Sequence, residues 1–486
     1  MRDQASIEVT IVGAGPGGLF AAHKLVNKLG GRVKILIVDR GCPSTIRSCK
    51  ALINGCKNCK ICDLVSGGGG AGLFSDGKLI FDLYSGGDLR EIISPEKKRE
   101  IESQIRDVID TFSSKYVYKK SAFPDDVRSC LQKQNIHLKT YPVLHIGSYD
   151  LRNFIQQFIT YLQKVNVKFL FNTEVKEIKY DFSSNQWTIK AISRKNTRII
   201  RTNYLVLSVG KEGNFWLTNQ LEKFGGKVED NYTYMGVRME ISDLSAKNFY
   251  DFSLDPKFSF CSDYVKIKTH CFCRHGQVIL LKYSHLSPDY SNLLLAGGHT
   301  PYIEIDEQYN PEKFLNSNFA ILYRDKSVCT KEKALEVMKE CNKITNGKLL
   351  IQRLGDFVEN IPTTEQKLKS NKIKPSNPNV VVPEEIPNNL LPGFRGIFIP
   401  FLEKLESCFP GVMDQDNLLY FPAIEWWMRK IKVNNNMEVI GFPNLYVIGD
   451  GSGWTQGIIQ SAATGIISAS DILQKIDKKE TRERKT

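Results

Sequence analysis

The feature that most constrains this chain is a glycine-rich turn that joins an apolar strand to a helix near the N-terminus. Residues 7–12 are mostly apolar and β-branched, the turn spans residues 13–18, and a helical pattern with one apolar face follows. Gly13 permits the tight bend, Gly15 lets the backbone approach a pyrophosphate, and Gly18 lets the helix pack closely on the sheet. The N-terminus of such a helix attracts negative charge, because its N–H groups lack partners and its dipole is positive there. The segment therefore predicts a dinucleotide-binding strand–turn–helix unit.

The second predicted strand supports this interpretation, because it ends in an acid. Residues 33–38 are mostly apolar and lead into Asp39, about 20 residues beyond the last glycine of the turn. A carboxylate at that position accepts a hydrogen bond from a ribose 2′-hydroxyl, and it disfavours the 2′-phosphate of NADP. The alternative is an ordinary βαβ unit that binds no ligand.

Length and composition indicate a globular protein of two or three domains. The chain has 486 residues, of which 42% are hydrophobic, and we expect no membrane span because it contains no long apolar run. The first predicted strand begins at residue 7, so we expect no signal or transit peptide and a cytoplasmic location. The net charge of +13 comes partly from residues 367–374 and from a basic, flexible tail at 476–486. Neither stretch interleaves aromatic residues with its charges, so we expect no nucleic-acid partner, whereas attraction of an anionic substrate stays open.

A segment near the C-terminus completes the predicted site. The strand at 445–448 ends in the Gly-Asp-Gly sequence of residues 449–451, and a helix begins near Gly457. Asp450 would bond a ribityl hydroxyl or, through water, the pyrophosphate. N–H groups around Gly457 and Ile458 would face the flavin pyrimidine edge, where reduction places negative charge. An enzyme that uses only NAD needs no such second clamp, so the sequence predicts FAD.

Over most of the chain these features resemble the FAD-dependent oxidoreductases of the glutathione-reductase-like superfamily. The residues that carry the resemblance are the turn 13–18, Asp39 and Arg40, the pair Glu174 and Val175, the run 205–210, and residues 449–451. The resemblance implies that the backbone at Val175 contacts the adenine and that Gly210 closes a middle strand-and-glycine motif.

The run GGGGAGLFSDGKL at residues 67–79 is similar to the signature of a narrower group, the uncharacterised FAD-dependent dehydrogenases. Further segments that fit the same group are residues 56–62, 145–147, 236–238, 297–299 and 318–320. The chain departs from the group at residues 145–150, which carry an extra residue, and at His270, where an aromatic residue is expected. The resemblance implies a fold and a cofactor, and it leaves the substrate open.

We expect an α/β fold: a Rossmann-like FAD-binding domain with a central parallel sheet and a β-meander, plus an α+β substrate (cap) domain. Apolar residues at helical spacing predict helices at 101–112 and 151–162, and the Pro- and Asn-rich residues 375–393 predict a mobile loop. The predicted FAD-binding domain comprises residues 1–90, 140–225 and 395–475, and the predicted cap comprises residues 91–139 and 226–394.

Polar residues near the predicted flavin ring supply candidates for the chemistry. Small residues of the glycine-rich run let the backbone lie against the ring, and Ser75 or the Lys78 ammonium would stabilise charge on the reduced flavin. Asp76 is either a base near the ring or a carboxylate that caps a turn. Arg238 and His299 are candidates to orient or protonate the substrate, and the alternative for such a histidine is a structural role.

The twelve cysteines are better explained as thiols or metal ligands than as disulfides in a cytosolic enzyme. Cys56, Cys59 and Cys62 form a CxxCxxC motif, and Cys49 or Cys42 upstream would supply a fourth ligand. This spacing suits a zinc site or an iron–sulfur cluster. Redox-active thiols and plain reduced cysteines are the alternatives.

Cys271 and Cys273 flank Phe272 in an alternating stretch, so both would face one side of a strand. A nucleophilic or redox role for Cys271 requires a lowered thiol pKa, which nearby basic residues would provide. A buried pair of strand residues is the alternative.

The chain has no second GxGxxG motif, so we expect no dedicated NAD(P)H domain. Electrons would then come from the substrate, from NAD(P)H that visits the flavin transiently, or from an electron-transfer protein. We predict an FAD-dependent oxidoreductase that transfers a hydride between flavin N5 and a small-molecule substrate. A flavin monooxygenase and a non-enzymatic binding or escort protein are the alternatives.

The candidate residues fall into three sets. The catalytic candidates are Lys78, Asp76, Arg238, His299 and Cys271. The cofactor-binding candidates are Gly13, Gly15, Gly17, Gly18, Asp39, Arg40, Gly70, Ala71, Gly72, Ser75, Val175, Gly210, Gly449, Asp450, Gly457 and Ile458. The metal-ligand candidates are Cys49, Cys56, Cys59 and Cys62.

Overall fold

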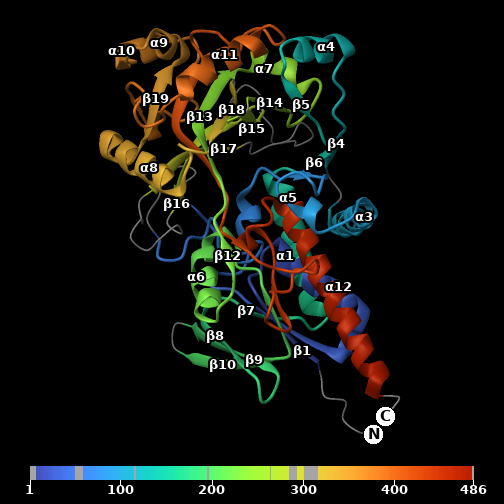
Figure 1. Cartoon of the computed structure of the whole chain (residues 1–486). Coiled ribbons are helices and arrows are strands. Elements are labelled where there is room, and N and C mark those ends of the chain that lie inside the picture. The colour runs from blue at the N-terminus through green and yellow to red at the C-terminus, as the bar shows by residue number, and fades with distance from the viewer. Residues whose placement is uncertain are drawn as a thin grey trace.

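Parallel and mixed sheets, covered by helices, make up the described part of this chain (Figure 1). The computed structural model describes residues 7–49, 59–113, 116–193, 196–262, 264–283, 293–299 and 316–483. The mixed α/β composition confirms the predicted fold class at that level.

Five parallel strands form the sheet that carries the glycine turn. Their order is β23 (Leu445–Val447), β11 (Tyr204–Leu207), β1 (Ile7–Val12), β2 (Val33–Val38) and β7 (Lys168–Leu170). Strand β1 is central and pairs with β11 on one side and β2 on the other. Helix α1 (Pro16–Leu29) connects β1 to β2 and packs against the long C-terminal helix α12 (Ile458–Glu483), drawn in red in Figure 1.

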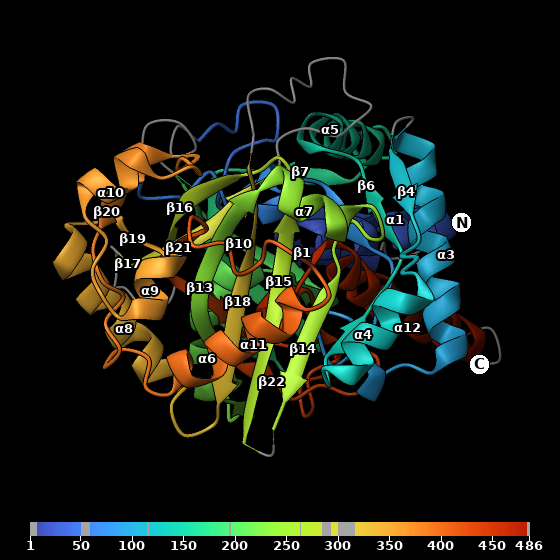
Figure 2. The ribbon, with the colours of Figure 1, turned by 90° about the horizontal axis from the view of Figure 1, so that it is seen from above.

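The second large sheet has eight strands. Its order is β20 (Val381–Pro383), β19 (Leu349–Arg353), β21 (Leu418–Trp426), β13 (Thr233–Ser242), β18 (Asn316–Asp325), β15 (Val265–Cys273), β14 (Lys257–Cys261) and β5 (His137–Lys139). Only β19 and β20 pair in parallel among these described strands. Helices α7 (Asp243–Tyr250) and α11 (Phe394–Glu406) cross one face of this sheet (Figure 2).

Smaller elements complete the structure. The meander β8 (Thr173–Asp181), β9 (Gln186–Ser193) and β10 (Thr197–Thr202) forms one antiparallel sheet, and β3 (Lys78–Ile80), β6 (Val143–His145) and β4 (Val117–Lys119) form another. Two strand pairs are β12 (Val228–Glu229) with β22 (Lys430–Ile431), and β16 (Gln277–Tyr283) with β17 (Leu293–His299). The remaining α-helices are α3 (Pro95–Phe112), α4 (Asp125–Lys133), α5 (Ser148–Lys164), α6 (Gly210–Lys223), α8 (Lys331–Thr345), α9 (Leu354–Glu359) and α10 (Glu365–Ser370).

Two large hydrophobic cores correspond to the two large sheets. Within the predicted cap segment 91–139, Ile101 and Ile105 of α3 pack in the core of the five-stranded sheet, and Leu131 packs in the core of the eight-stranded sheet. Within the predicted FAD-binding segment 395–475, Phe398 and Phe421 pack in the core of the eight-stranded sheet, and Ile472 packs in the core of the five-stranded sheet. Each of these two segments thus contributes to both cores, and the predicted domain boundaries stay a prediction.

A disulfide bond joins two residues that were expected to be thiols or metal ligands. Cys130 of α4 and Cys408, which follows α11, are bonded across 278 residues of sequence, with their Cα atoms 5.8 Å apart. The packing of α4 beside the end of α11 brings them together, and no local spacing motif marks the pair. Among the described residues, no helix combines the length and apolarity needed to cross a membrane.

Candidate active site

One cavity of about 570 Å³ collects residues from distant parts of the chain. It lies at the ends of β1, β2 and β11, where open α/β sheets bind their ligands, and its size is typical of a ligand site. Further segments that line it are the loop 64–76, residues 173–175, residues 208–216, the end of β17, and residues 449–461. All the predicted cofactor-binding residues line this cavity except Gly17 and Gly18.

The turn after β1 is shaped by close backbone approaches. Gly13 has φ +110°, and its N–H donates to the carbonyl oxygen of Val38 at 2.8 Å. A Cβ on Gly13 would clash with the carbonyl oxygen of Ser208, and a Cβ on Gly18 would clash with that of Gly13. Gly17 instead faces the Ser208 hydroxyl and Ser461 of α12. Gly17 and Gly18 therefore serve the packing of α1, and the start of this helix stays close to the cavity.

Asp39 holds the two backbone turns that flank it. Its Oδ2 accepts the N–H of Ala14 and its Oδ1 accepts the N–H of Gly41, both at 2.8 Å. An ionised carboxylate has about four acceptor sites, so Asp39 keeps capacity for a ligand hydroxyl in the cavity that it lines. Arg40 pairs with Glu212 of α6 at 2.7 Å. The sequence alone did not indicate Glu212, although it lies in the first turn of the helix after the middle strand.

A buried arginine organises the glycine-rich loop at residues 67–72. The Nη1 of Arg47 donates to the carbonyl oxygens of Gly68 at 2.7 Å and Gly70 at 2.8 Å, and the side chain is almost fully buried. The N–H of Gly69 donates to the carbonyl oxygen of Ala14 at 2.8 Å, which ties this loop to the first glycine turn. Sequence patterns missed Arg47, because no motif marks an arginine whose partners are backbone carbonyls.

The C-terminal segment contributes a helix start and a buried acid. Asp450 accepts hydrogen bonds from the Thr455 hydroxyl and the Gly457 N–H, each at 3.2 Å, and α12 begins at Ile458. Burial raises the pKa of Asp450 to about 6, although the nearby Lys211 ammonium lowers it. The Oε1 of Gln456 is buried beside the cavity and has no hydrogen-bond partner among the described residues.

Asp76 and Lys78 form a buried ion pair at one end of the cavity. Lys78 Nζ lies 3.2 Å from Asp76 Oδ2 and also donates to the carbonyl oxygen of Phe272. Burial by itself would raise the pKa of Asp76, but Lys78, His145 and His299 together hold it below its usual value. Burial likewise opposes the charge on Lys78, but Asp76 and the thiols of Cys271 and Cys273 raise its pKa well above the usual range. Asp76 lines the cavity, whereas Lys78 lies behind it.

The other catalytic candidates divide between the cavity wall and the sheet behind it. His299 lines the cavity, with its Nε2 3.4 Å from the Ser148 hydroxyl, and burial lowers its pKa. Cys271 also lines the cavity. Arg238 lies within the eight-stranded sheet, where its Nε donates to Asn318 at 2.6 Å and its Nη2 to the carbonyl oxygen of Cys271 at 2.9 Å. Arg238 therefore holds the backbone at Cys271 from within the sheet, and its predicted contact with the substrate stays a prediction.

The predicted metal site is only partly described. Cys56 lies outside the described residues, while Cys49, Cys59 and Cys62 lie within them. No group of three or more His, Cys, Asp or Glu side chains in the described ranges is arranged to hold a metal ion. Zinc and iron–sulfur binding by the CxxCxxC motif thus stays a prediction.

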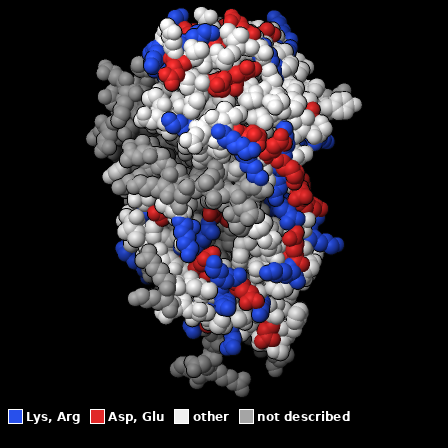
Figure 3. Space-filling model, turned by 90° about the vertical axis from the view of Figure 1, so that its left-hand side faces the viewer, with Lys and Arg blue, Asp and Glu red and all other residues white. Residues whose placement is uncertain are grey.

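Surface features elsewhere do not match the predicted site. On the face in Figure 3, basic and acidic side chains lie intermixed, so the net positive charge forms no uniform basic surface there.

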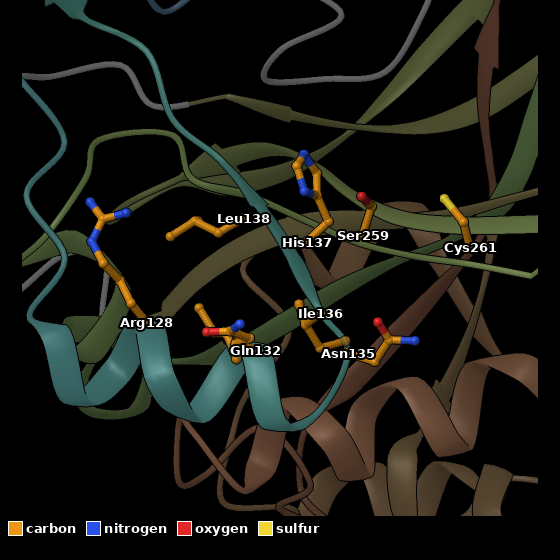
Figure 4. A pocket seen from close by; sticks show the side chains of 9 residues that line it. Arg128, Gln132, Asn135, Ile136, His137, Leu138, Ser259 and Cys261 are labelled. Atoms are coloured by element: carbon orange, nitrogen blue, oxygen red, sulfur yellow. The ribbon is translucent and has the colours of Figure 1, made fainter.

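A second groove of about 380 Å³ lies between α4 and the strands β5 and β14, and Arg128, His137 and Cys261 are among its lining residues (Figure 4). No predicted site residue lines it.

No protein-family model matches the chain, and no curated protein matches its sequence. Among solved structures, a flavoprotein/dehydrogenase from Cytophaga hutchinsonii is similar, with 12% identity, a TM-score of 0.39, and coverage of 95% of this chain and 75% of that one. The FAD-bound L-α-glycerophosphate oxidase from Mycoplasma pneumoniae shares 9% identity at a TM-score of 0.41, with 97% and 95% coverage.

Aklavinone-11 hydroxylase in complex with FAD and aklavinone shares 12% identity at a TM-score of 0.39, and the matched region covers 98% of this chain and 63% of that one. All three neighbours are flavoproteins by their descriptions. Similarity of this degree assigns no reaction to the chain, which has to be inferred from its own residues.

Proposed function

We propose that this protein is an FAD-dependent oxidoreductase that transfers a hydride between the flavin and a small-molecule substrate. The observation that carries the proposal is the convergence of three backbone segments on one cavity: the glycine turn after β1, the loop at 70–75, and the start of α12. The fit is supported by the Oε1 of Gln456, a buried acceptor without a hydrogen-bond partner in the part of the chain that the structure describes. Glycines on the cavity wall leave the space that a flat ring and a pyrophosphate need.

The residues would divide the binding between them. The start of α1 would hold the pyrophosphate, Asp39 the ribose hydroxyl, and the backbone at Val175 the adenine. The loop at 70–75 and the start of α12 would border the ring, with Asp450 near the ribityl chain. Bound FAD would supply the two-electron chemistry.

The side chains around the ring would control protons and charge. Asp76 is kept ionised by Lys78, so its carboxylate can accept a proton from a substrate group. Burial lowers the pKa of His299, which favours the neutral imidazole, so the ring can hold or pass a proton at the cavity wall. Lys78 keeps its positive charge and stabilises negative charge that develops nearby.

The first experiment asks whether FAD binds at this cavity. The purified full-length chain should release FAD on denaturation and should bleach on anaerobic addition of a hydride donor. Gly15→Ala should keep the fold, because its Cβ would lie 3.7 Å from the nearest atom, the Gly70 Cα. Its affinity for FAD should fall by at least about tenfold, since the added methyl group meets the pyrophosphate path.

Gly396→Ala is the matched control, because a Cβ there meets no atom within 4 Å and α11 lies outside the cavity. A protein that takes up no FAD would overturn the proposal and favour a binding or escort role. Incorporation of an oxygen atom from O₂ into a product would favour monooxygenation over hydride transfer. NAD(P)H is one of the hydride donors to test in the bleaching experiment, as the predicted transient reductant of the flavin.

A further inference from the structure

A β-bulge in β15 brings two thiols together beside the cavity. The register between β15 and β18 shifts between His270 and Cys273, and Cys271 has φ +52°, a conformation that few residues other than glycine adopt. The sulfur atoms of Cys271 and Cys273 consequently lie 3.9 Å apart. Bulges and such backbone outliers concentrate at functional sites, where they aim side chains.

Two cations lie against this pair of thiols. Arg238 Nη2 donates to Cys273 Sγ at 3.2 Å, and a Cβ on Gly298 would overlap the same guanidinium, so the arginine is held in place. Lys78 Nζ donates to the carbonyl oxygen of Phe272, the residue between the two cysteines. A guanidinium and an ammonium so close to two sulfur atoms favour a thiolate.

The two thiols differ in environment. The hydrogen bond from Cys273, together with Lys78 and Arg238, lowers the pKa of Cys271, although burial opposes this. The same hydrogen bond and burial raise the pKa of Cys273. Cys271 lines the cavity, whereas Cys273 is completely buried. The accessible sulfur is therefore the one on which negative charge is favoured.

We propose that Cys271 and Cys273 form a redox-active dithiol/disulfide pair that exchanges a hydride equivalent with the flavin bound in this cavity. Two electrons and one proton, which together make a hydride equivalent, convert the disulfide into a Cys271 thiolate and a Cys273 thiol. Reduced flavin held in this cavity would supply that equivalent and would itself be oxidised. The reverse reaction would form the S–S bond and return the equivalent to oxidised flavin. The inference rests on the proposed flavin site.

The pair would give the protein a second two-electron store, which a dithionite titration of the oxidised holoprotein measures. Under anaerobic conditions we expect the wild type to take up two equivalents of dithionite per flavin, not counting any reduction of the Cys130–Cys408 disulfide. Cys271→Ser and Cys273→Ser should each take up one equivalent. Cys261→Ser should behave as the wild type, because Cys261 is an exposed cysteine outside this cavity.

Thiol mapping provides a readout that does not depend on the flavin. After mild oxidation, alkylation of the denatured protein should leave the peptide with Cys271 and Cys273 unmodified, and prior reduction should make both residues reactive. Uptake of a single equivalent by a flavin-loaded wild type, with both thiols still alkylated after oxidation, would overturn the inference and leave the proposed function intact. Absence of bound flavin would instead refute the proposed function, and the mapping would still show whether the disulfide forms.

Discussion

At the scale of single residues, the Asp76–Lys78 ion pair sets the charge at one end of the cavity. Both side chains are mostly buried, with 12% and 9% of their surface exposed. We expect Lys78→Met to lower the free energy of unfolding by about 3–5 kcal/mol, because the Asp76 carboxylate would stay buried without its cation. Urea denaturation at neutral pH measures this loss.

The double variant Asp76→Asn/Lys78→Met tests the cause. It should recover part of the lost free energy, since it removes the uncompensated charge together with its partner. The loss in Lys78→Met should also shrink as the pH falls, because protonation of Asp76 relieves the penalty. Equal stability of the single and the double variant would show that packing of the lysine stem, and not its charge, matters at this position.

Asp450 should give the protein a characteristic pH dependence in the absence of added flavin. Its pKa is raised from 3.8 to about 6 in the folded protein, mainly by burial. A raised pKa in the folded state means that folding favours the protonated carboxyl group of Asp450. The stability that this group contributes is therefore complete below its unfolded-state pKa, and it is lost as the pH rises through about 6. Two pKa units correspond to about 3 kcal/mol.

Relative to Asp450→Asn, the wild type should therefore lose up to about 3 kcal/mol between pH 4 and pH 7. The asparagine keeps an oxygen for the Gly457 N–H but does not titrate. Parallel urea denaturation of the two proteins across this pH range isolates the effect, because the other titrating groups are shared. A constant difference between them would show that burial does not raise the pKa of Asp450.

At the scale of elements, α1 and α12 pack against each other, and the first residues of both helices line the cavity. A Cβ on Gly465 of α12 would overlap the carbonyl oxygen of Gly17 in α1. We expect Gly465→Ala to destabilise the protein by about 1–3 kcal/mol and to weaken FAD binding, because the helices must separate. Thermal unfolding and flavin titration measure the two effects.

Gly396→Ala on α11 is the control for Gly465→Ala. Its Cβ would meet no atom within 4 Å, so it should be neutral or stabilise the helix by up to about 1 kcal/mol. A Gly465→Ala protein as stable as this control would show that α1 and α12 adjust freely to each other.

Two helices with one apolar face were predicted from the sequence, whereas one short strand was not. The apolar spacing at 101–112 and 151–162 predicts two helices, and α3 and α5 confirm them, with Ile105 and Phe158 fully buried. The region 375–393 differs, because its residues Val381–Pro383 form β20 beside β19, where a mobile loop was expected. That strand is stabilised by pairing with a partner distant in sequence, which local composition does not encode.

At the scale of the whole molecule, cavity residues could be predicted from the sequence at positions where the backbone geometry restricts the type of residue. Gly13 and Asp39 carry such signals, because a tight turn and an acid-tipped strand restrict the residues allowed. Arg47 and Glu212 carry none, since their partners are backbone carbonyls and a distant arginine. The division between the two cores likewise depends on which apolar face each helix covers, which the order of segments along the chain does not specify.

The Cys130–Cys408 disulfide closes a loop of 278 residues and packs against the core of the eight-stranded sheet, next to Leu131 and Phe409. We expect Cys130→Ser/Cys408→Ser to lower the free energy of unfolding by about 2–4 kcal/mol, because a long loop closed in the unfolded state restricts its entropy. Wild type in strong reductant should lose the same amount, whereas the double variant should not respond to reductant. Urea denaturation with and without reductant measures all four states, and a wild type that does not respond to reductant would show that this bond does not form in solution.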